Sequence, residues 1–342
     1  MKQFYFFCVA TALLVNTIVA NAQATSGQYG DNLYWSFNSS TGELTFTGSG
    51  DMYNYPMSPP WNSYLTNITS VSLPDGITSI DRNAFENCIG LTSITIPDSV
   101  TSIGLYAFKG SGLMSITIPN SIASISYAAF SGCTNLKSVI IPELVISIGE
   151  SAFARSGLTS VTIPNSVTEI GWGAFFDCSD LESITVAGNN SNYSSIDGIL
   201  FNKQQSTLIQ CPGGKTGTVI IPHSVTEFEM CAFFGCDNLT SVINQSLTPQ
   251  EINADTFSSD VYTNATLYVP AASLAFYKEA EGWERFNIKP LETSDITVPK
   301  KDNTATQIIG YYSLSGQKLP QESQKGMYII LYSNGKTEKV LR

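Results

Sequence analysis

The 342-residue sequence contains a single histidine, His223, and only 13% of its residues are charged. One histidine leaves almost no way to build a nucleophile with a histidine base, or a zinc site that uses imidazoles. Basic residues are also scarce, with 17 Lys and Arg against 28 Asp and Glu. Nucleic acid and anionic membranes are therefore poor partners, because binding them requires clustered positive charge.

Long apolar runs are absent after the first residues of the chain. The one such run extends from Phe4 to Ala20 and is followed by the small-x-small sequence Ala20-Asn21-Ala22. This pattern is typical of a signal peptide, here residues 1–22, and the run is short for a membrane span. We therefore expect a protein that is secreted or placed on the outer cell surface after cleavage near Ala22, and not an integral membrane protein.

What the chain does have is a strong internal repeat. Successive copies include LTSITIPDSVTSIGLYAFKGSG and LTSVTIPNSVTEIGWGAFFDC, and a later copy reads VIIPHSVTEFEMCAFFGC. A proline recurs every 22 or 23 residues at Pro74, Pro97, Pro119, Pro142 and Pro164, and returns at Pro222 after an insertion. Self-similarity at this period predicts a repeat solenoid, in which each unit forms one coil.

Each position of the repeat has a structural interpretation. Alternating apolar and polar residues before the proline predict a short strand, and the proline ends it because it cannot donate to a strand ladder. Stacked coils would align one phenylalanine of each unit into an internal column and one serine into an inner hydroxyl row. The column comprises Phe85, Phe108, Phe130, Phe153, Phe175 and Phe233; the row comprises Ser70, Ser93, Ser115, Ser138, Ser160, Ser183 and Ser241.

Six cysteines remain after signal-peptide cleavage, which in an exported protein could form disulfides. Cys88, Cys133 and Cys178 recur in alternate units, and Cys236 holds the same position in the last copy. Two coils separate neighbours by roughly 10 Å, which exceeds disulfide reach, so we expect small buried hydrophobes. A bond between Cys211 and Cys231, or between Cys231 and Cys236, stays open.

The copies of SITIPxSVTSIGxxAFxxC resemble the BspA-like leucine-rich repeats of surface and secreted proteins of Bacteroidetes, spirochaetes and some protists. The resemblance implies a leucine-rich-repeat solenoid: a right-handed, β-rich coil with short strands, short helical turns and a β-rich N-terminal cap. The cap would span residues 23–66 and the repeats residues 67–290. The resemblance also implies a hairpin-bearing insertion at about 187–220 and a closing unit at about 245–290 with a short helix from about Ser273 to Glu281.

The last residues differ in composition from the repeats. Residues 291–342 contain seven basic and five acidic residues, whereas residues 23–290 contain nine and 23. Residues 291–307 are interpreted as a polar linker. Residues 308–342 resemble the C-terminal secretion-signal domain of Bacteroidetes, through their Leu-x-Gly-Gln, Lys-Gly-x-Tyr-Ile and Gly-Lys sequences.

Candidate functional residues are few. Glu169 and Glu227 occupy equivalent repeat positions, and a carboxylate pair could serve a weak glycoside hydrolase, although a solenoid face offers no evident pocket. His223 fills an ordinary turn position. Aromatic residues are frequent at binding hot spots, so Tyr53, Tyr55, Trp61 and Tyr64 in the cap and Tyr193 in the insertion are candidate contacts. The alternative is that the cap aromatics cover the first coil.

These features favour a binding protein over an enzyme, with no catalytic, metal-binding or cofactor-binding residue predicted. We expect a secreted or cell-surface protein that mediates adhesion or protein–protein binding. The family resemblance implies extracellular host proteins such as fibronectin or fibrinogen as partners. A glycan-binding module or the weak hydrolase is the alternative function, and a structural spacer without any ligand is a third.

Overall fold

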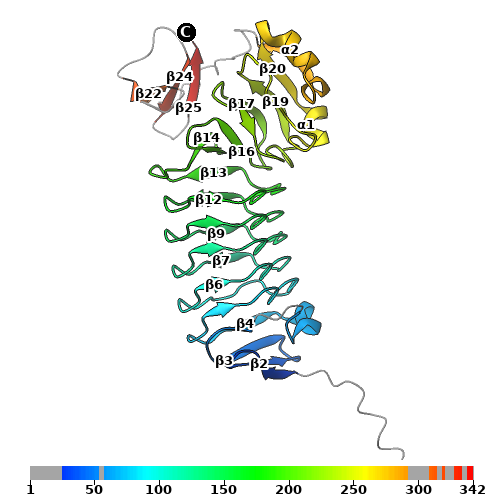
Figure 1. The fold of residues 1–342 in the computed structure, drawn as a ribbon, viewed down its shortest axis with the longest axis vertical. Helices are drawn as coiled ribbons and strands as arrows, with labels where there is room; N and C mark the ends of the chain where they lie inside the picture. Colours follow the sequence, from blue (N-terminus) through cyan, green and yellow to red (C-terminus); the bar gives the residue numbers. More distant parts are fainter. Residues whose placement is uncertain are drawn as a thin grey trace, which may run out of the picture.

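The structure is a computed structural model that describes residues 25–53 and 58–291 and four strands between residues 308 and 341. The described chain forms an elongated stack of coils (Figure 1). The fold is therefore the β-rich repeat solenoid that the repeat predicts. The expected signal peptide and the expected linker beyond Leu291 lie outside the described residues. None of the described helices is long and apolar enough to cross a membrane.

A small sheet caps the first coil. Strands β1 (Ser26–Gln28), β2 (Asn32–Asn38) and β3 (Glu43–Ser49) pair in antiparallel fashion, and alternate residues of β2 are buried. Strand β3 then pairs in parallel with β4 (Ser70–Ser72), the first strand of the coils. The cap thus continues the ladder of the solenoid and covers the end that would otherwise be an open edge.

The regular coils contribute two series of short strands. The strands before the proline position are β4, β7 (Ser115–Thr117), β9 (Ser138–Ile140), β11 (Ser160–Ile163) and β13 (Ser183–Val186), with Ala187 in place of the proline after β13. The coil of Pro97 has no strand at this place. The strands after the proline position are β5 (Ser79–Ile80), β6 (Ser102–Ile103), β8 (Ser124–Ile125), β10 (Ser147–Ile148) and β12 (Glu169–Ile170). Strand pairs are parallel and join equivalent positions, as in Ser115 with Ser138. Equivalent side chains therefore stack along the molecule.

The predicted phenylalanine column is confirmed in the first five coils. The rings of Phe85, Phe108, Phe130, Phe153 and Phe175 are at most 2% exposed. Successive centroids lie 5.3 to 5.8 Å apart, and the interplanar angles are 2 to 26°. The column does not continue from Phe175 to Phe233 as expected; Phe233 instead stacks on Phe257 at 4.6 Å.

The predicted inner row of serines is wrong. Ser115, Ser138 and Ser160 are exposed, because their strands turn the following Ile or Val inward and neighbouring side chains alternate between faces. Hydroxyls that do bond to main-chain carbonyls belong to other repeat positions. Ser99 donates to the Ile77 carbonyl oxygen, and Ser121 donates to that of Val100.

The turn around each buried phenylalanine requires two residues with left-handed backbone. The first lies two positions before that phenylalanine and includes Tyr106, Ala128 and Ser151, with φ between 49° and 59°. The second lies two positions after that phenylalanine, and two of the coils have a glycine there, Gly110 and Gly132. We call this segment the Ala-Phe turn. Its two reversals fold the chain sharply enough to point the ring into the core.

All six cysteines of the described residues are free and buried. The thiols of Cys133 and Cys178 donate to the carbonyl oxygens of Phe108 and Phe153, at 3.0 and 3.1 Å. Burial raises the pKa of Cys88 to about 12 and the pKa values of Cys133 and Cys178 to about 11. The cysteine column is therefore part of the core, and the disulfides left open for Cys211, Cys231 and Cys236 are not formed.

The second half of the stack begins with the hairpin-bearing insertion. The strands of this second half are β14 (Tyr193–Ile196), β15 (Ile199–Asn202), β16 (Thr207–Gln210), β17 (Gly217–Ile221), β18 (Glu227–Phe228) and β19 (Leu239–Asn244). It closes with α1 (Ser259–Asn264), β20 (Thr266–Pro270), α2 (Leu274–Glu279) and β21 (Asn287–Leu291). Helix α2 is the short helix expected in the closing unit.

The buried residues form two hydrophobic clusters that divide at β15. Leu200 belongs to the first cluster, whereas its neighbours Ile199 and Phe201 belong to the second. Further along, β22 (Ile308–Ser313), β23 (Lys318–Leu319), β24 (Met327–Tyr332) and β25 (Thr337–Leu341) form an antiparallel sheet in the order β23-β22-β24-β25. The C-terminal residues are thus a separate β unit with its own pairing.

The phenylalanine column makes a first prediction. Phe130→Ala should lower the free energy of unfolding by about 3–5 kcal/mol, because it leaves a cavity between two stacked rings. Tyr127→Ala, which changes a partly exposed ring in the same coil, should cost about 1 kcal/mol or less. Urea unfolding followed by far-UV circular dichroism measures both. Equal losses in the two variants would contradict the stacking role.

The cysteine column makes a second prediction, concerning pH. Its pKa values are raised in the folded protein, so the unfolded chain loses thiol protons first as the pH rises above about 9. The stabilisation is complete below that pH and is lost as the pH rises towards 11 and 12. The urea midpoint of the wild type should therefore fall between about pH 8 and 10.5, and a Cys133→Ala/Cys178→Ala variant should show a smaller fall.

Candidate functional site

The aromatic residues of the cap divide between core and surface. Trp61 is completely buried, and its indole nitrogen donates to the Ala84 carbonyl oxygen at 2.7 Å. Tyr64 is half-buried and stacks on Phe37 at 4.6 Å. Tyr53 is 42% exposed, whereas Tyr55 lies outside the described residues. Trp61 and Tyr64 therefore serve to cover the first coil, and Tyr53 is the exposed aromatic of this group.

The two carboxylates proposed for hydrolysis lie on an open strand face. Glu169 and Glu227 are both exposed at the first positions of β12 and β18. Strand β16 adds a coil between them, because Thr207 pairs directly with Glu227. On its other edge β16 pairs with β15 and not with β12, so Glu169 and Glu227 do not lie on adjacent strands. His223 is likewise exposed beside Pro222 in its turn.

Tyr193 lies where the stack changes from one half to the other. Its hydroxyl accepts a hydrogen bond from the backbone N–H of Ile170 at 2.9 Å. In the regular coils, a main-chain carbonyl of the neighbouring coil would be the partner at this level. Burial raises the pKa of the Tyr193 hydroxyl, and the nearby carboxylates of Glu169 and Glu229 raise it further. The Tyr193 side chain thus takes the place of a main-chain acceptor in the strand ladder.

The coil that contains β16 lacks an Ala-Phe turn. Hydrogen bonds between successive turns join the backbone N–H of the column phenylalanines from Phe85 to Phe153 to the next coil, as in Phe153 to the Ala174 carbonyl. Cys211 makes the equivalent bond to Ala232, so it stands where a phenylalanine would be. Four positions separate Thr207 from Cys211, whereas six separate its partner Glu227 from Phe233. The turn is therefore two residues shorter and supplies no ring to the column.

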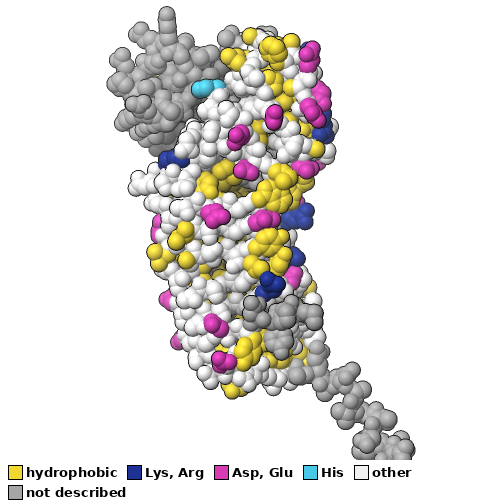
Figure 2. All heavy atoms as spheres, viewed as in Figure 1, with side chains coloured by type: hydrophobic (Ala, Val, Ile, Leu, Met, Phe, Trp, Pro, Cys, Tyr) yellow, Lys and Arg dark blue, Asp and Glu magenta, His cyan; other side chains and the backbone are white. Residues whose placement is uncertain are grey.

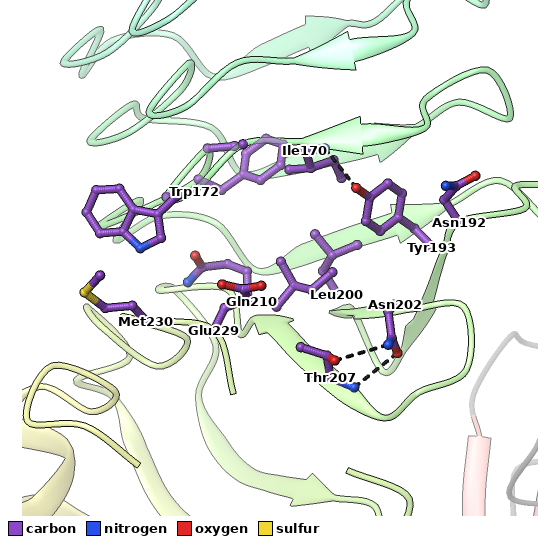
Figure 3. A pocket seen from close by; sticks show the side chains of 15 residues that line it. Ile170, Trp172, Asn192, Tyr193, Leu200, Asn202, Thr207, Gln210, Glu229 and Met230 are labelled. Atoms are coloured by element: carbon purple, nitrogen blue, oxygen red, sulfur yellow. Dashed lines mark hydrogen bonds between the residues drawn. The ribbon is translucent and has the colours of Figure 1, made fainter. Parts of the chain in front are cut away.

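A cleft of about 330 Å³ opens beside this shortened turn. Trp172 lies at one rim with Met230 across from it, and Tyr193 lies at the far end (Figure 3). Gln210 and Glu229 lie next to each other in the middle, over a floor that includes Leu200. Trp172 and Met230 belong to coils on either side of the shortened one. The cleft is the space that a normal Ala-Phe turn would fill.

The polar side chains of the cleft differ in their hydrogen-bond partners. Asn202 uses its side-chain oxygen and nitrogen within its own hairpin, with Ser206 and Thr207. The side-chain nitrogen of Gln210 donates to the carbonyl oxygens of Cys211 and Ala232, at 2.9 and 3.4 Å. Within the described residues, no hydrogen bond or ion pair engages the carboxylate of Glu229. An acceptor with negative charge is therefore available at the centre.

Aromatic rings continue from the cleft along the Ala-Phe turns. Trp172 is 40% exposed and lies 6.3 Å from the Phe176 ring, which in turn contacts Phe234 at 4.7 Å. Phe176 and Phe234 meet although a coil separates them, because the shortened turn does not project between their rings. Arg155 lies over the other side of Phe176, at 5.6 Å. The rim of the cleft is thus held by ring packing.

A second exposed apolar feature lies on the coil of β9 and β10. Ile140, Leu144 and Ile146 are 69%, 63% and 53% exposed. They stand at positions where the following coil has Thr162, Ser166 and Thr168. We call these three residues the apolar corner, since they surround the bend between the two strands. Figure 2 shows hydrophobic side chains gathered in separate places along the middle of the solenoid.

Tyr193 was predicted from the sequence as a contact residue, whereas the cleft in which it lies was not. The exposed Trp172 and Glu229 occupy ordinary variable positions of the repeat, and no pattern distinguishes them. The signal was the sequence IQCPGG, where the insertion omits the residues that precede the phenylalanine in other units.

Comparisons with solved structures found bacterial leucine-rich proteins. A leucine-rich repeat protein from Eubacterium ventriosum is 25% identical, with a TM-score of 0.55 over 73% of this chain and 67% of that one. A leucine-rich cell surface protein from Faecalibacterium prausnitzii is 23% identical over 81% of this chain and 97% of its own, with a TM-score of 0.48. A leucine-rich repeat protein from Bacteroides ovatus is 25% identical over 76% of each chain, with a TM-score of 0.41. No curated protein matches the sequence significantly.

The family comparison is decisive for the repeats. Six copies of the BspA type leucine-rich repeat region match residues 63–182 and 210–278, which are more than half of the chain. The gap between the two matches contains the hairpin of β14 and β15, where the regular coils are interrupted. By its sequence, its stacked coils and its phenylalanine column, the chain belongs to the BspA-type leucine-rich repeat family.

Proposed function

We propose that this protein is a secreted or cell-surface adhesion module that binds other proteins through the side of its solenoid. The observation that carries the proposal is the apolar corner. Ile140, Leu144 and Ile146 expose apolar side chains together, at three positions where the neighbouring coil is polar. Single exposed apolar residues are ordinary, whereas grouped ones mark contact surfaces.

The scaffold suits such a contact. Coils stacked through main-chain hydrogen bonds hold the corner in a fixed position, so binding costs little ordering of the backbone. Solenoid proteins commonly use extended lateral faces for recognition. The leader-like first 22 residues support export. Extracellular matrix proteins such as fibronectin or fibrinogen are the partners that the family resemblance suggests.

Catalysis is the weaker alternative. Glu169 and Glu227 are separated by an extra coil and lie on an exposed strand face, outside the residues that line the cleft. A hydrolase needs its two carboxylates at a site that holds the substrate between them. The arrangement therefore favours binding over glycoside hydrolysis.

A variant that restores the polar repeat tests the proposal. Ile140→Thr/Leu144→Ser/Ile146→Thr copies the residue types of the following coil, so the fold should be preserved. Binding of the mature chain to immobilised fibronectin and fibrinogen, measured by biolayer interferometry, should weaken more than about tenfold, since buried apolar area is lost.

The matched control is Trp172→Ala, which removes an exposed ring at the cleft and leaves the apolar corner intact. It should bind these proteins as the wild type does. If the wild type binds neither fibronectin nor fibrinogen at micromolar concentration, the proposed partners are wrong. If it binds but the triple variant binds equally well, the apolar corner is not the contact.

A further inference from the structure

We propose that the cleft between Trp172 and Tyr193 is a binding site for a short neutral saccharide. This site lies at the shortened turn, away from the apolar corner, and it stands independently of the protein-binding proposal. Its volume of about 330 Å³ is at the lower end of the range for small-ligand pockets and suits one or two sugar rings.

Trp172 presents an exposed aromatic face at the rim of the cleft. Sugar rings present C–H groups on their flat faces, which pack against aromatic rings while their hydroxyls stay at the edge. Trp172 is 40% exposed at the rim and is supported from behind by Phe176. The chain's other three tryptophans, Trp35, Trp61 and Trp283, are at most 3% exposed. Trp172 is thus the one tryptophan placed for contact with a ligand.

Hydrogen-bond acceptors line the cleft beside that ring. Hydroxyl groups need acceptors, and an ionised carboxylate provides the strongest. The carboxylate of Glu229 has no partner within the described residues, and it lies in the middle of the cleft (Figure 3). The amide of Gln210 is fixed there by two donated bonds, so its position is set before a ligand arrives.

The charge of the cleft selects against anionic sugars. Its lining residues include Glu229 and no Lys or Arg, and Glu169 lies close enough to influence the pKa of Tyr193. Sialylated or sulfated saccharides would meet repulsion from these carboxylates. Neutral hexoses and N-acetylhexosamines satisfy the same acceptors without that cost.

The origin of the cleft explains why only this coil has it. A normal Ala-Phe turn would place two further residues between Trp172 and Met230. The coil of β16 omits them, and the backbone nitrogen of Ile170 bonds to the Tyr193 hydroxyl. The shortened turn therefore opens the cleft, and Tyr193 of the hairpin closes its far end.

Tryptophan fluorescence of the full mature chain tests the site directly, because Trp172 is the exposed reporter. Methyl β-glucoside, cellobiose, lactose and diacetylchitobiose serve as neutral probes. At least one should change the emission saturably with a Kd below about 1 mM. Sialyllactose should bind more weakly than lactose, since Glu229 repels it.

Variants assign the signal to the cleft. Glu229→Gln should weaken the best neutral probe about tenfold. Trp172→Ala should abolish its binding in calorimetry, whereas Trp172→Phe should retain part of it. Tyr127→Ala, at the equivalent turn position two coils earlier, should bind as the wild type does. Unchanged fibronectin binding in Glu229→Gln would show that the two sites are separate.

Three outcomes would overturn the proposal. One is the absence of a saturable change with every neutral probe up to about 10 mM. Another is equal affinity of the wild type, Glu229→Gln and Trp172→Ala. The third is saturation by N-acetylarginine amide in place of the sugars, which would make the cleft a site for cationic side chains held by Trp172 and Glu229.

Discussion

The parallel register between coils is the constraint on which the rest of the molecule depends. Because equivalent residues pair, as Ser115 with Ser138 and Ser147 with Glu169, every repeat position becomes a row along the stack. One row places phenylalanine rings in contact, another buries thiols, and a third fixes the left-handed residues of the Ala-Phe turns. A single main-chain rule thus converts a 22- or 23-residue period into a continuous core, and no coil buries its own hydrophobic face alone.

The same constraint explains where binding features arise. The sides of a regular stack are uniform, because equivalent residues repeat in every coil. A cleft therefore requires a coil that differs from its neighbours, and an apolar surface requires apolar residues at outward positions. The shortened turn at Cys211 supplies the first departure, and the isoleucines and leucine near Pro142 supply the second. The apolar substitutions leave the inward rows of their coil intact, whereas the shortened turn interrupts the phenylalanine column between Phe175 and Phe233. The two proposed contact features therefore differ in what they change in the core.

The sequence predicted the solenoid, the column from Phe85 to Phe175 and the buried cysteines, because a fixed period determines which residues stack. It did not predict the interruption at Cys211, since the missing residues become apparent only when Thr207 is paired with Glu227. The serine row was misplaced because the serine and the isoleucine that follows it alternate faces, and burial of the isoleucine sends the serine outward. The cleft was missed for a related reason. Trp172 and Glu229 come from different coils and meet only through an insertion whose path the repeat does not specify.

The division of the core at β15 has a mechanical consequence. In the proposed adhesion role, the molecule would carry tension along its length, and that tension would pass from coil to coil through main-chain hydrogen bonds. The turn bonds run continuously up to Ala174, and on the strand side the backbone N–H of Ile170 bonds to the Tyr193 hydroxyl in place of a main-chain carbonyl. Neighbouring side chains of β15 also belong to different clusters, so the apolar core is divided at this level. Tension along the axis of the stack would concentrate at this level and move Trp172 away from Met230. The width of the cleft would then depend on the force applied to the molecule.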